Sequence, residues 1–181
     1  MGYKQNRTWS DNLLPKVKII LSDFVIKEST YFEDTRQVTD LKTNSSTFGV
    51  RIRTYEYFKR YPDDFTVRKT ELPKIMEGYP DFYFYGFLNQ EQTDFIQYFV
   101  GDMFIFRRWY FDNDIDRSQL TRMKNKDGSR SFYVFNIKNF PRNFIIKTNI
   151  NSTHQRKAHE SSTPEMPRMF ESEHQKRYTE K

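Results

Sequence analysis

The aromatic content of this chain constrains its fold more than any other feature. Phe, Tyr and Trp make up 18% of the 181 residues, half of the 36% that are hydrophobic, whereas alanine occurs once and leucine seven times. Aromatic and β-branched side chains pack well on a pleated surface and lose rotamer freedom in a helix. We therefore expect a core that favours sheet over helix, in a chain of single-domain size.

Cysteine and histidine usage removes several kinds of chemistry. The chain has no cysteine, which excludes disulfides, thiolate nucleophiles and cysteine-ligated zinc. Its histidines are His154, His159 and His174, all in a segment without apolar periodicity that we interpret as a flexible or loosely docked tail, residues 151–181. The expected domain, residues 1–150, then has no histidine for a Ser-His-Asp site or a metal site, which favours oxygen-ligated ions such as Mg²⁺.

The charge of the chain favours a polyanionic partner. The formal net charge is +6, and residues 102–147 hold ten Lys or Arg against five Asp. This balance leans towards nucleic acid, and we expect DNA rather than RNA. No apolar run approaches the roughly 20 residues that span a bilayer, and no signal-peptide core is visible, so we expect a cytoplasmic protein without a membrane partner. A protein partner or a homo-oligomer stays open.

Periodicity predicts the order of the elements. In the strand over residues 47–58, Phe48, Val50 and Ile52 should share one face, with Arg51 and Arg53 on the other. The "NSS" turn suits a hairpin with the strand before it. The expected elements are a helix at 11–28, strands at 37–43, 47–58, 64–70 and 81–87, a short helix at 70–78, a helix continuing into a strand at 92–111, and strand pieces at 131–140 and 143–150.

Five short motifs, "TDL", "VRIR", "FTVR", "TELPKI" and "DFYFYGF", occur in an order that resembles phage-type and bacterial proteins of the PD-(D/E)XK, or restriction-endonuclease-like, superfamily. The resemblance covers roughly residues 10–110. It implies an α/β (α+β) fold with a central mixed sheet flanked by helices. It also implies a Mg²⁺-dependent nuclease that activates water against a phosphodiester of DNA.

The family's metal-binding positions are only partly present. Asp40 would match the acid of the first hairpin, and Glu28 or Glu33 the acid of the N-terminal helix. Arg51 and Arg53 stand where the family has its acid-x-Lys pair. Arginine can neither ligate a cation nor act as a base at neutral pH, so another acid must replace it or the site is inactive.

Residues of the next helix could replace the missing acid and lysine. Glu71 would supply the missing acid, and Lys74, three residues later on the same helix face, the missing lysine. The predicted catalytic set is then Asp40, Glu71 and Lys74, with Asp40 and Glu71 binding Mg²⁺. Each carboxylate also has a structural interpretation: Asp40 could bond to backbone at a strand end, and Glu71 could favour a helix N-terminus.

The basic residues likewise allow two interpretations. Arg51, Arg53 and Arg68, with Lys69, could form a row of phosphate contacts. The same arginines could instead be a solvated strand face, in which case the nearby acids would pair with them. The candidate acids are Asp63, Asp64 and Glu56.

A second basic group lies in "FIFRRWYF", where Arg107 and Arg108 adjoin Trp109 and could form a cation and stacking patch on nucleic acid. Base stacking is also open to Tyr55, Tyr57, Tyr83 and Tyr85, although a core short of leucine and alanine needs most of these rings.

Two hypotheses of function follow. The chain is a nucleic-acid-binding protein that acts as a Mg²⁺-dependent DNA endonuclease, or it is a non-catalytic phage accessory or host-takeover protein that binds nucleic acid or a host protein. Arginines at the acid-x-Lys positions favour the second hypothesis.

Overall fold

The computed structural model describes residues 12–23, 27–115, 120, 122–124 and 131–150, the side chains of 122–124 excepted. The chain divides into two units, Met1–Ile150 and Asn151–Lys181. The second unit, which includes the predicted tail, lies outside the described residues.

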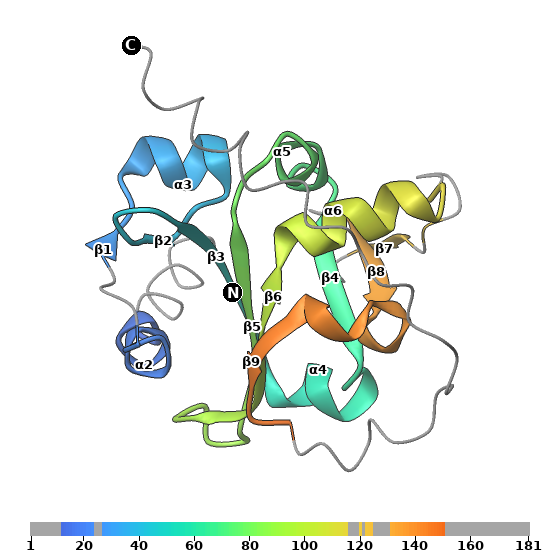
Figure 1. Cartoon of the computed structure of the whole chain (residues 1–181). Helices are drawn as coiled ribbons and strands as arrows, with labels where there is room; N and C mark the ends of the chain where they lie inside the picture. Colours follow the sequence, from blue (N-terminus) through green and yellow to red (C-terminus); the bar gives the residue numbers. More distant parts are fainter. Residues whose placement is uncertain (1–11, 24–26, 116–119, 121, 125–130, 151–181) are drawn as a thin grey trace. The chain divides into compact units, whose positions relative to one another are not determined.

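A six-stranded mixed sheet forms the centre of the first unit (Figure 1). The strand order is β1-β2-β3-β5-β6-β9, in which β3 and β5 run parallel and all other neighbours antiparallel. The predicted α/β class with a central mixed sheet is therefore confirmed. The strands are β1 (Lys27–Glu28), β2 (Leu41–Lys42), β3 (Thr47–Arg53), β5 (Phe82–Leu88), β6 (Phe95–Asp102) and β9 (Ile145–Thr148).

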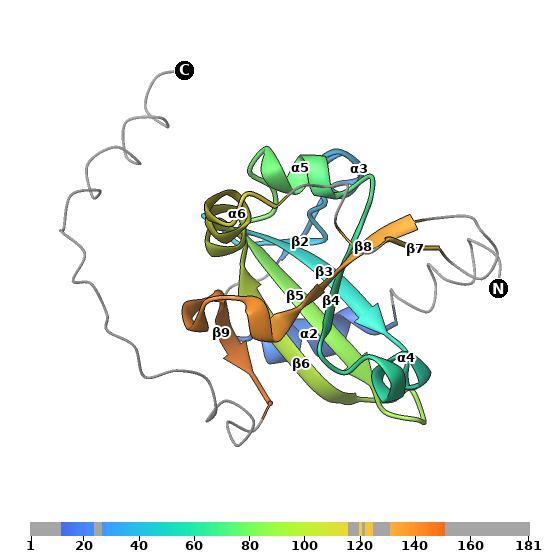
Figure 2. The same cartoon turned by 90° about the vertical axis from the view of Figure 1, so that its right-hand side faces the viewer.

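A second, three-stranded sheet has the order β4-β8-β7. Its strands are β4 (Asp64–Arg68), β7 (Arg122–Lys124) and β8 (Ser131–Asn136). Figures 1 and 2 show β4 and β8 in front of one face of the central sheet, opposite the face that α2 covers.

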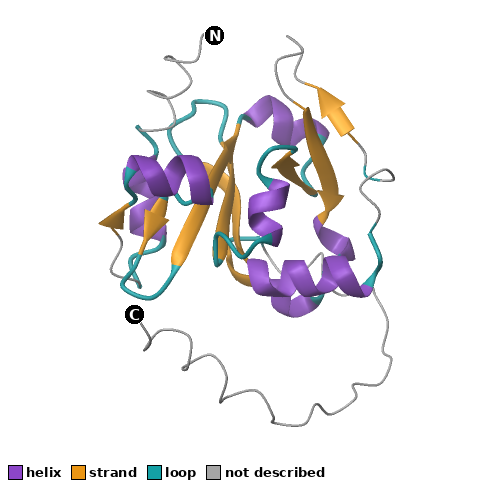
Figure 3. Ribbon diagram, turned by 90° about the horizontal axis from the view of Figure 1, so that it is seen from above, coloured by secondary structure: helices purple, strands orange, loops and turns teal. Residues whose placement is uncertain are grey.

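Five α-helices and two short 3-10 helices connect these strands in the described part of the chain, and they cover both faces of the central sheet (Figures 1 and 3). None of the helices in this part is long and apolar enough to cross a membrane. The helices are α2 (Leu14–Ile20), α3 (Tyr31–Gln37), α4 (Tyr55–Arg60), α5 (Leu72–Met76), α6 (Met103–Asp112), η1 (Ile137–Asn139) and η2 (Arg142–Phe144).

The alternation of β3 divides the core into two clusters, as predicted. Phe48, Val50 and Ile52 pack with α2 on one face of the sheet. The other face carries Tyr83, Tyr85 and Phe99, which pack against β4, β8, α5 and α6. Arg51 and Arg53 point to this second face and bond to the tyrosines there. The predicted hairpin is also confirmed, since β2 and β3 pair around Ser45 with Leu41 opposite Phe48.

The larger cluster is held together by aromatic rings, which confirms that most of them serve the core. The ring of Phe65 lies edge-on to Tyr83, Phe106 and Phe144 at 5.5 to 5.9 Å. Phe140 lies 4.6 Å from Trp109. Offset and edge-on pairs of this kind stabilise a core beyond the area they bury.

Several sequence predictions of secondary structure are wrong, most of them where a side chain caps a helix. The helix expected at 11–28 is described only as α2, and Lys27–Glu28 form β1. A capping box of Thr30 and Glu33 starts the helix α3, which was not expected and extends to Gln37. The strand expected at 37–43 is therefore limited to β2. Thr54 caps α4 and ends β3 early. Asp102 accepts two backbone N–H groups, so over 92–111 the strand β6 precedes the helix α6, the reverse of the expected order.

Close packing at Gly101 gives a test of this core. A Cβ at Gly101 would lie 2.5 Å from Cζ of the buried Phe144 ring. Gly101→Ala should therefore lower the free energy of unfolding by about 1–3 kcal/mol, measured by urea denaturation. Phe144→Leu in the same chain should cost less than it does alone, because it makes room for the methyl group. If the losses in unfolding free energy of the two substitutions simply add, the close contact between Gly101 and Phe144 is contradicted.

Candidate functional site

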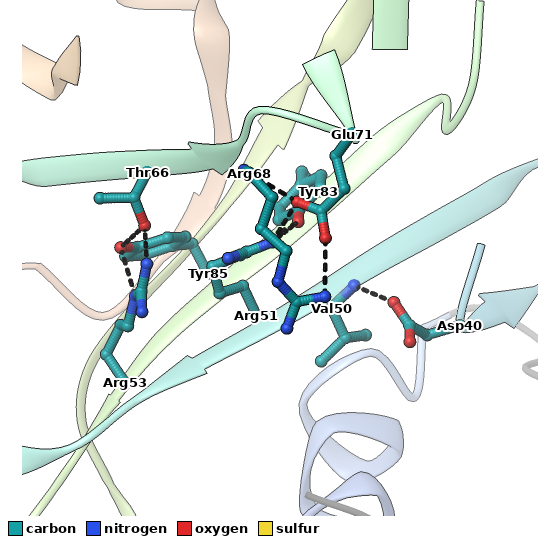
Figure 4. Close-up of polar contacts among 9 residues, drawn as sticks. All are labelled: Asp40, Val50, Arg51, Arg53, Thr66, Arg68, Glu71, Tyr83 and Tyr85. Carbon is teal, nitrogen blue, oxygen red and sulfur yellow. Dashed lines mark hydrogen bonds and ion pairs between the residues drawn. The ribbon is translucent and has the colours of Figure 1, made fainter. Parts of the chain in front are cut away.

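The predicted site residue Glu71 lies in a buried ion pair. Arg51 Nη2 donates to Glu71 Oε2, and the two side chains are only 9% and 10% exposed. Arg68 contributes its backbone N–H to Oε2 at 3.1 Å and its Nη1 to Oε1 at 3.0 Å (Figure 4). Both carboxylate oxygens are therefore bound by groups from β3 and β4.

The electrostatics of this group favour the charged forms. Burial alone would raise the pKa of Glu71, but the guanidinium groups of Arg51 and Arg68 outweigh it and lower that pKa. Burial would likewise depress the pKa of Arg51, yet the Glu71 carboxylate raises it. Tyr83 Oη accepts from Nε and Nη2 of Arg51, each at 3.3 Å. The arrangement is an internal salt bridge that joins β3, β5 and the segment entering α5.

Arg53 forms a second network beside the first, in which its hydrogen-bond partners are uncharged hydroxyl groups. Its Nε donates to Tyr85 Oη at 3.1 Å, and its Nη2 donates to Thr66 Oγ1. Thr66 Oγ1 and Tyr85 Oη lie 2.9 Å apart. The guanidinium carbon also sits 4.8 Å from the centre of the Tyr57 ring. This arginine is thereby fixed between the two sheets.

The predicted row of phosphate-binding arginines is thus divided by the fold. Arg51 and Arg53 face the interior because the second sheet covers this face of β3. Arg68, with 44% of its side chain exposed, and the exposed Lys69 lie at the end of β4 and remain at the surface. Of the acids weighed as their partners, Asp63 pairs with Lys138, Glu56 pairs with Lys59, and Asp64 accepts from the hydroxyl of Tyr57.

Asp40 supports the edge of β3 beyond the end of β2. Its Oδ2 accepts the N–H of Val50 at 2.6 Å, and its own N–H donates to the carbonyl of Phe48. This confirms the structural interpretation of Asp40. Burial raises the pKa of the Asp40 carboxyl to about 7, and the negative charges of Asp34 and Glu71 add to the increase.

The other predicted residues lie around α5 and α6. Lys74 reaches away from the core and donates to the carbonyl of Thr35 on α3. Arg107 donates to the carbonyls of Ile75 and Pro80, and burial lowers its pKa. Arg108 is 55% exposed and lies 3.5 Å from Asp112. Only Arg108 of these three presents its charge to solvent away from backbone carbonyls.

These residues do not fit a Mg²⁺ site. Such a site needs carboxylate oxygens that can converge on one ion. Both oxygens of Glu71 accept from arginines, and a cation there would meet the charges of Arg51 and Arg68. Across the part of the chain that the structure describes, no three acidic or histidine side chains group closely enough to hold a metal ion.

Sequence reasoning missed the residues that hold the arginines in place. Tyr83 and Tyr85 were weighed only as core or stacking rings, and Thr66 was not considered. The alternation of β5 places both tyrosines on the face that Arg51 and Arg53 share, and the parallel register sets Tyr83 opposite Gly49 and Tyr85 opposite Arg51. That shared face was the available signal.

Comparisons with protein-family models, with curated proteins and with solved structures give no match to this chain. The restriction-endonuclease-like resemblance therefore stays a prediction. The fold and site define an α/β protein whose candidate site is a buried arginine and glutamate network.

Removal of Glu71 should destabilise the fold strongly. Glu71→Ala leaves Arg51 buried without its counter-charge, so the free energy of unfolding should fall by about 3–5 kcal/mol in urea denaturation. Glu56→Ala is a matched control, because Glu56 pairs with Lys59 at the surface, and it should cost less than about 1 kcal/mol. Equal losses in the two variants would contradict a structural role of the buried pair.

Asp40 should make stability depend on pH. Its pKa is about 7 in the folded protein against 3.8 for a free Asp, so the folded state binds this proton more tightly. Its contribution to stability is then lost as the pH rises from about 4 to 7 and is constant above. Between pH 5 and pH 8, the free energy of unfolding of the wild type should fall by about 2–3 kcal/mol through this group. Asp40→Asn cannot titrate there and should not show this fall in urea denaturation. Parallel pH profiles would show that Asp40 titrates normally.

Proposed function

We propose that this protein binds nucleic acid without cleaving it. The observation that supports the non-catalytic choice is the pairing of Glu71 with Arg51 and Arg68. The acid that would have to bind a metal is the internal counter-ion of two arginines. Releasing it for catalysis would leave a buried guanidinium group unpaired, at a cost of several kcal/mol.

Charge supports nucleic acid as the partner. The chain carries a formal net charge of +6, and the buried pair of Arg51 and Glu71 adds nothing to it. The excess therefore comes from other groups, among them Lys69 and Arg108 at the surface. Cationic side chains at a surface bind phosphates by releasing condensed counterions, which is independent of any metal.

The test is binding of labelled DNA and RNA followed by fluorescence anisotropy, with Mg²⁺ or EDTA present. Affinity should fall steeply between about 50 and 200 mM salt, should not change with EDTA, and supercoiled DNA should stay uncut. Cleavage that depends on Mg²⁺ and is lost in Asp40→Ala would overturn the proposal in favour of a nuclease. Absence of binding at low salt would remove nucleic acid as the partner.

Two exposed lysines test where nucleic acid contacts the protein. Lys69 is exposed after β4, and Lys59 is exposed on α4, which precedes β4. Lys69→Ala should weaken binding and reduce the salt slope by about one phosphate contact, whereas Lys59→Ala should leave both unchanged. The opposite result would place the nucleic acid at the α4 end of the strand.

A further inference from the structure

Exposed aromatic rings gather on one set of helices. Of the six exposed aromatic side chains among the described residues, five lie on α3, on α6 or just after α5, and Tyr61 is the exception. Exposed isoleucines lie elsewhere, at Ile19, Ile96 and Ile146. The five rings are Tyr31, Phe32, Tyr79, Phe104 and Phe111.

The helices that carry these rings are neighbours. Lys74 on α5 bonds to the carbonyl of Thr35 on α3, and Arg107 on α6 bonds to the carbonyls of Ile75 and Pro80. Figures 1 and 2 show α3, α5 and α6 near the same end of the sheet. Tyr79 lies next to Pro80, so it belongs to the same region.

Two of the helices repeat an aromatic and arginine pair at helical spacing. Phe32 and Arg36 on α3 are four residues apart, as are Phe104 and Arg108 on α6, and all four side chains are exposed. Residues at this spacing lie on the same side of a helix. Phe111 extends the row on α6 by almost another turn. We call the row of Phe104, Arg108 and Phe111 on α6 the aromatic–arginine face, and Phe32 and Arg36 repeat its spacing on α3.

The rings sit on supports that are fixed before any partner binds. Asp102 Oδ1 accepts the N–H groups of Phe104 and Ile105 at 2.8 and 3.2 Å, which caps α6. The capping box of Thr30 and Glu33 does the same for α3. Phe111 lies edge-on to the buried Tyr110 ring at 6.2 Å. A preformed surface of this kind loses little entropy on binding.

We propose that the aromatic–arginine face binds single-stranded nucleic acid, with Phe104 and Phe111 stacking on bases and Arg108 contacting a phosphate. The proposal rests on the nucleic-acid function above. Flat rings offer a stacking surface to any unpaired base, whereas a duplex hides its bases from them. Guanidinium groups at one-turn spacing from the rings complement the phosphates between stacked bases.

Acidic residues on these helices make stacking the larger contribution. Asp112 pairs with Arg108, and Asp34 and Glu77 are exposed on the same helices. An exposed ion pair is weak, so a phosphate can displace Asp112. The same charges make this face less attractive to a duplex, which offers only its phosphates here.

The test compares three labelled probes: a single-stranded oligonucleotide, its duplex, and an abasic strand of equal length that keeps the phosphates. The wild type should bind the base-bearing strand best. Phe104→Ala with Phe111→Ala should lower that affinity by about ten-fold or more and remove the preference over the abasic strand. Ile19→Ala on α2, also an exposed apolar residue, should change nothing.

The possible negative results distinguish failure of the proposed face from failure of the proposed nucleic-acid function. If single strand and duplex bind equally, and the double variant binds them as the wild type does, the aromatic–arginine face is overturned but nucleic-acid binding is kept. Binding of no probe would overturn both proposals. Concentration-dependent self-association without nucleic acid, lost in the same variant, would show instead that a second copy occupies the face.

Discussion

The ion pair between Arg51 and Glu71 is the interaction on which the arrangement of the other elements depends. It joins β3 of the central sheet to the segment between β4 and α5, and Tyr83 on β5 completes it. Burying two charges costs several kcal/mol for each ion, which is recovered only when their hydrogen bonds are satisfied. Here each ion has at least two partners. The pair therefore fixes the position of α5, and through it the neighbouring α3 and α6.

The same pair explains why the alternation of β3 was predicted correctly and its meaning was not. A period of two identifies which residues share a face, so Arg51 and Arg53 could be grouped from sequence. It does not identify what covers that face. The cover comes from β4 and from β8, and β8 lies about eighty residues after β3 in the sequence. Tertiary pairing over that separation leaves no local pattern, and a polar face that is enclosed looks the same in sequence as one that is solvated.

Local chemistry limited the secondary-structure prediction in a different way. The strands β3, β4 and β5 and the helix α5 were predictable, because their patterns and turn residues agree. In α4, Tyr55 and Tyr57 continue the alternation of β3, so the cap at Thr54 competed with a pattern that favoured a longer strand. The capping box of Thr30 and Glu33 was a usable signal for α3. The partner of Glu71 was not predictable, because Arg51 lies twenty residues away in the sequence and is brought to Glu71 by the tertiary fold.

Composition alone does not explain where the exposed rings lie. A chain with 18% aromatic residues will leave some at the surface, and single exposed rings need no explanation. Scattered exposure would place them on unrelated elements, as it does the exposed Ile19, Ile96 and Ile146. Instead, five of the six exposed rings among the described residues lie on α3, on α6 or just after α5, and side-chain bonds link these helices. The arginines inside therefore serve the architecture, and those beside the rings are the ones available to a partner.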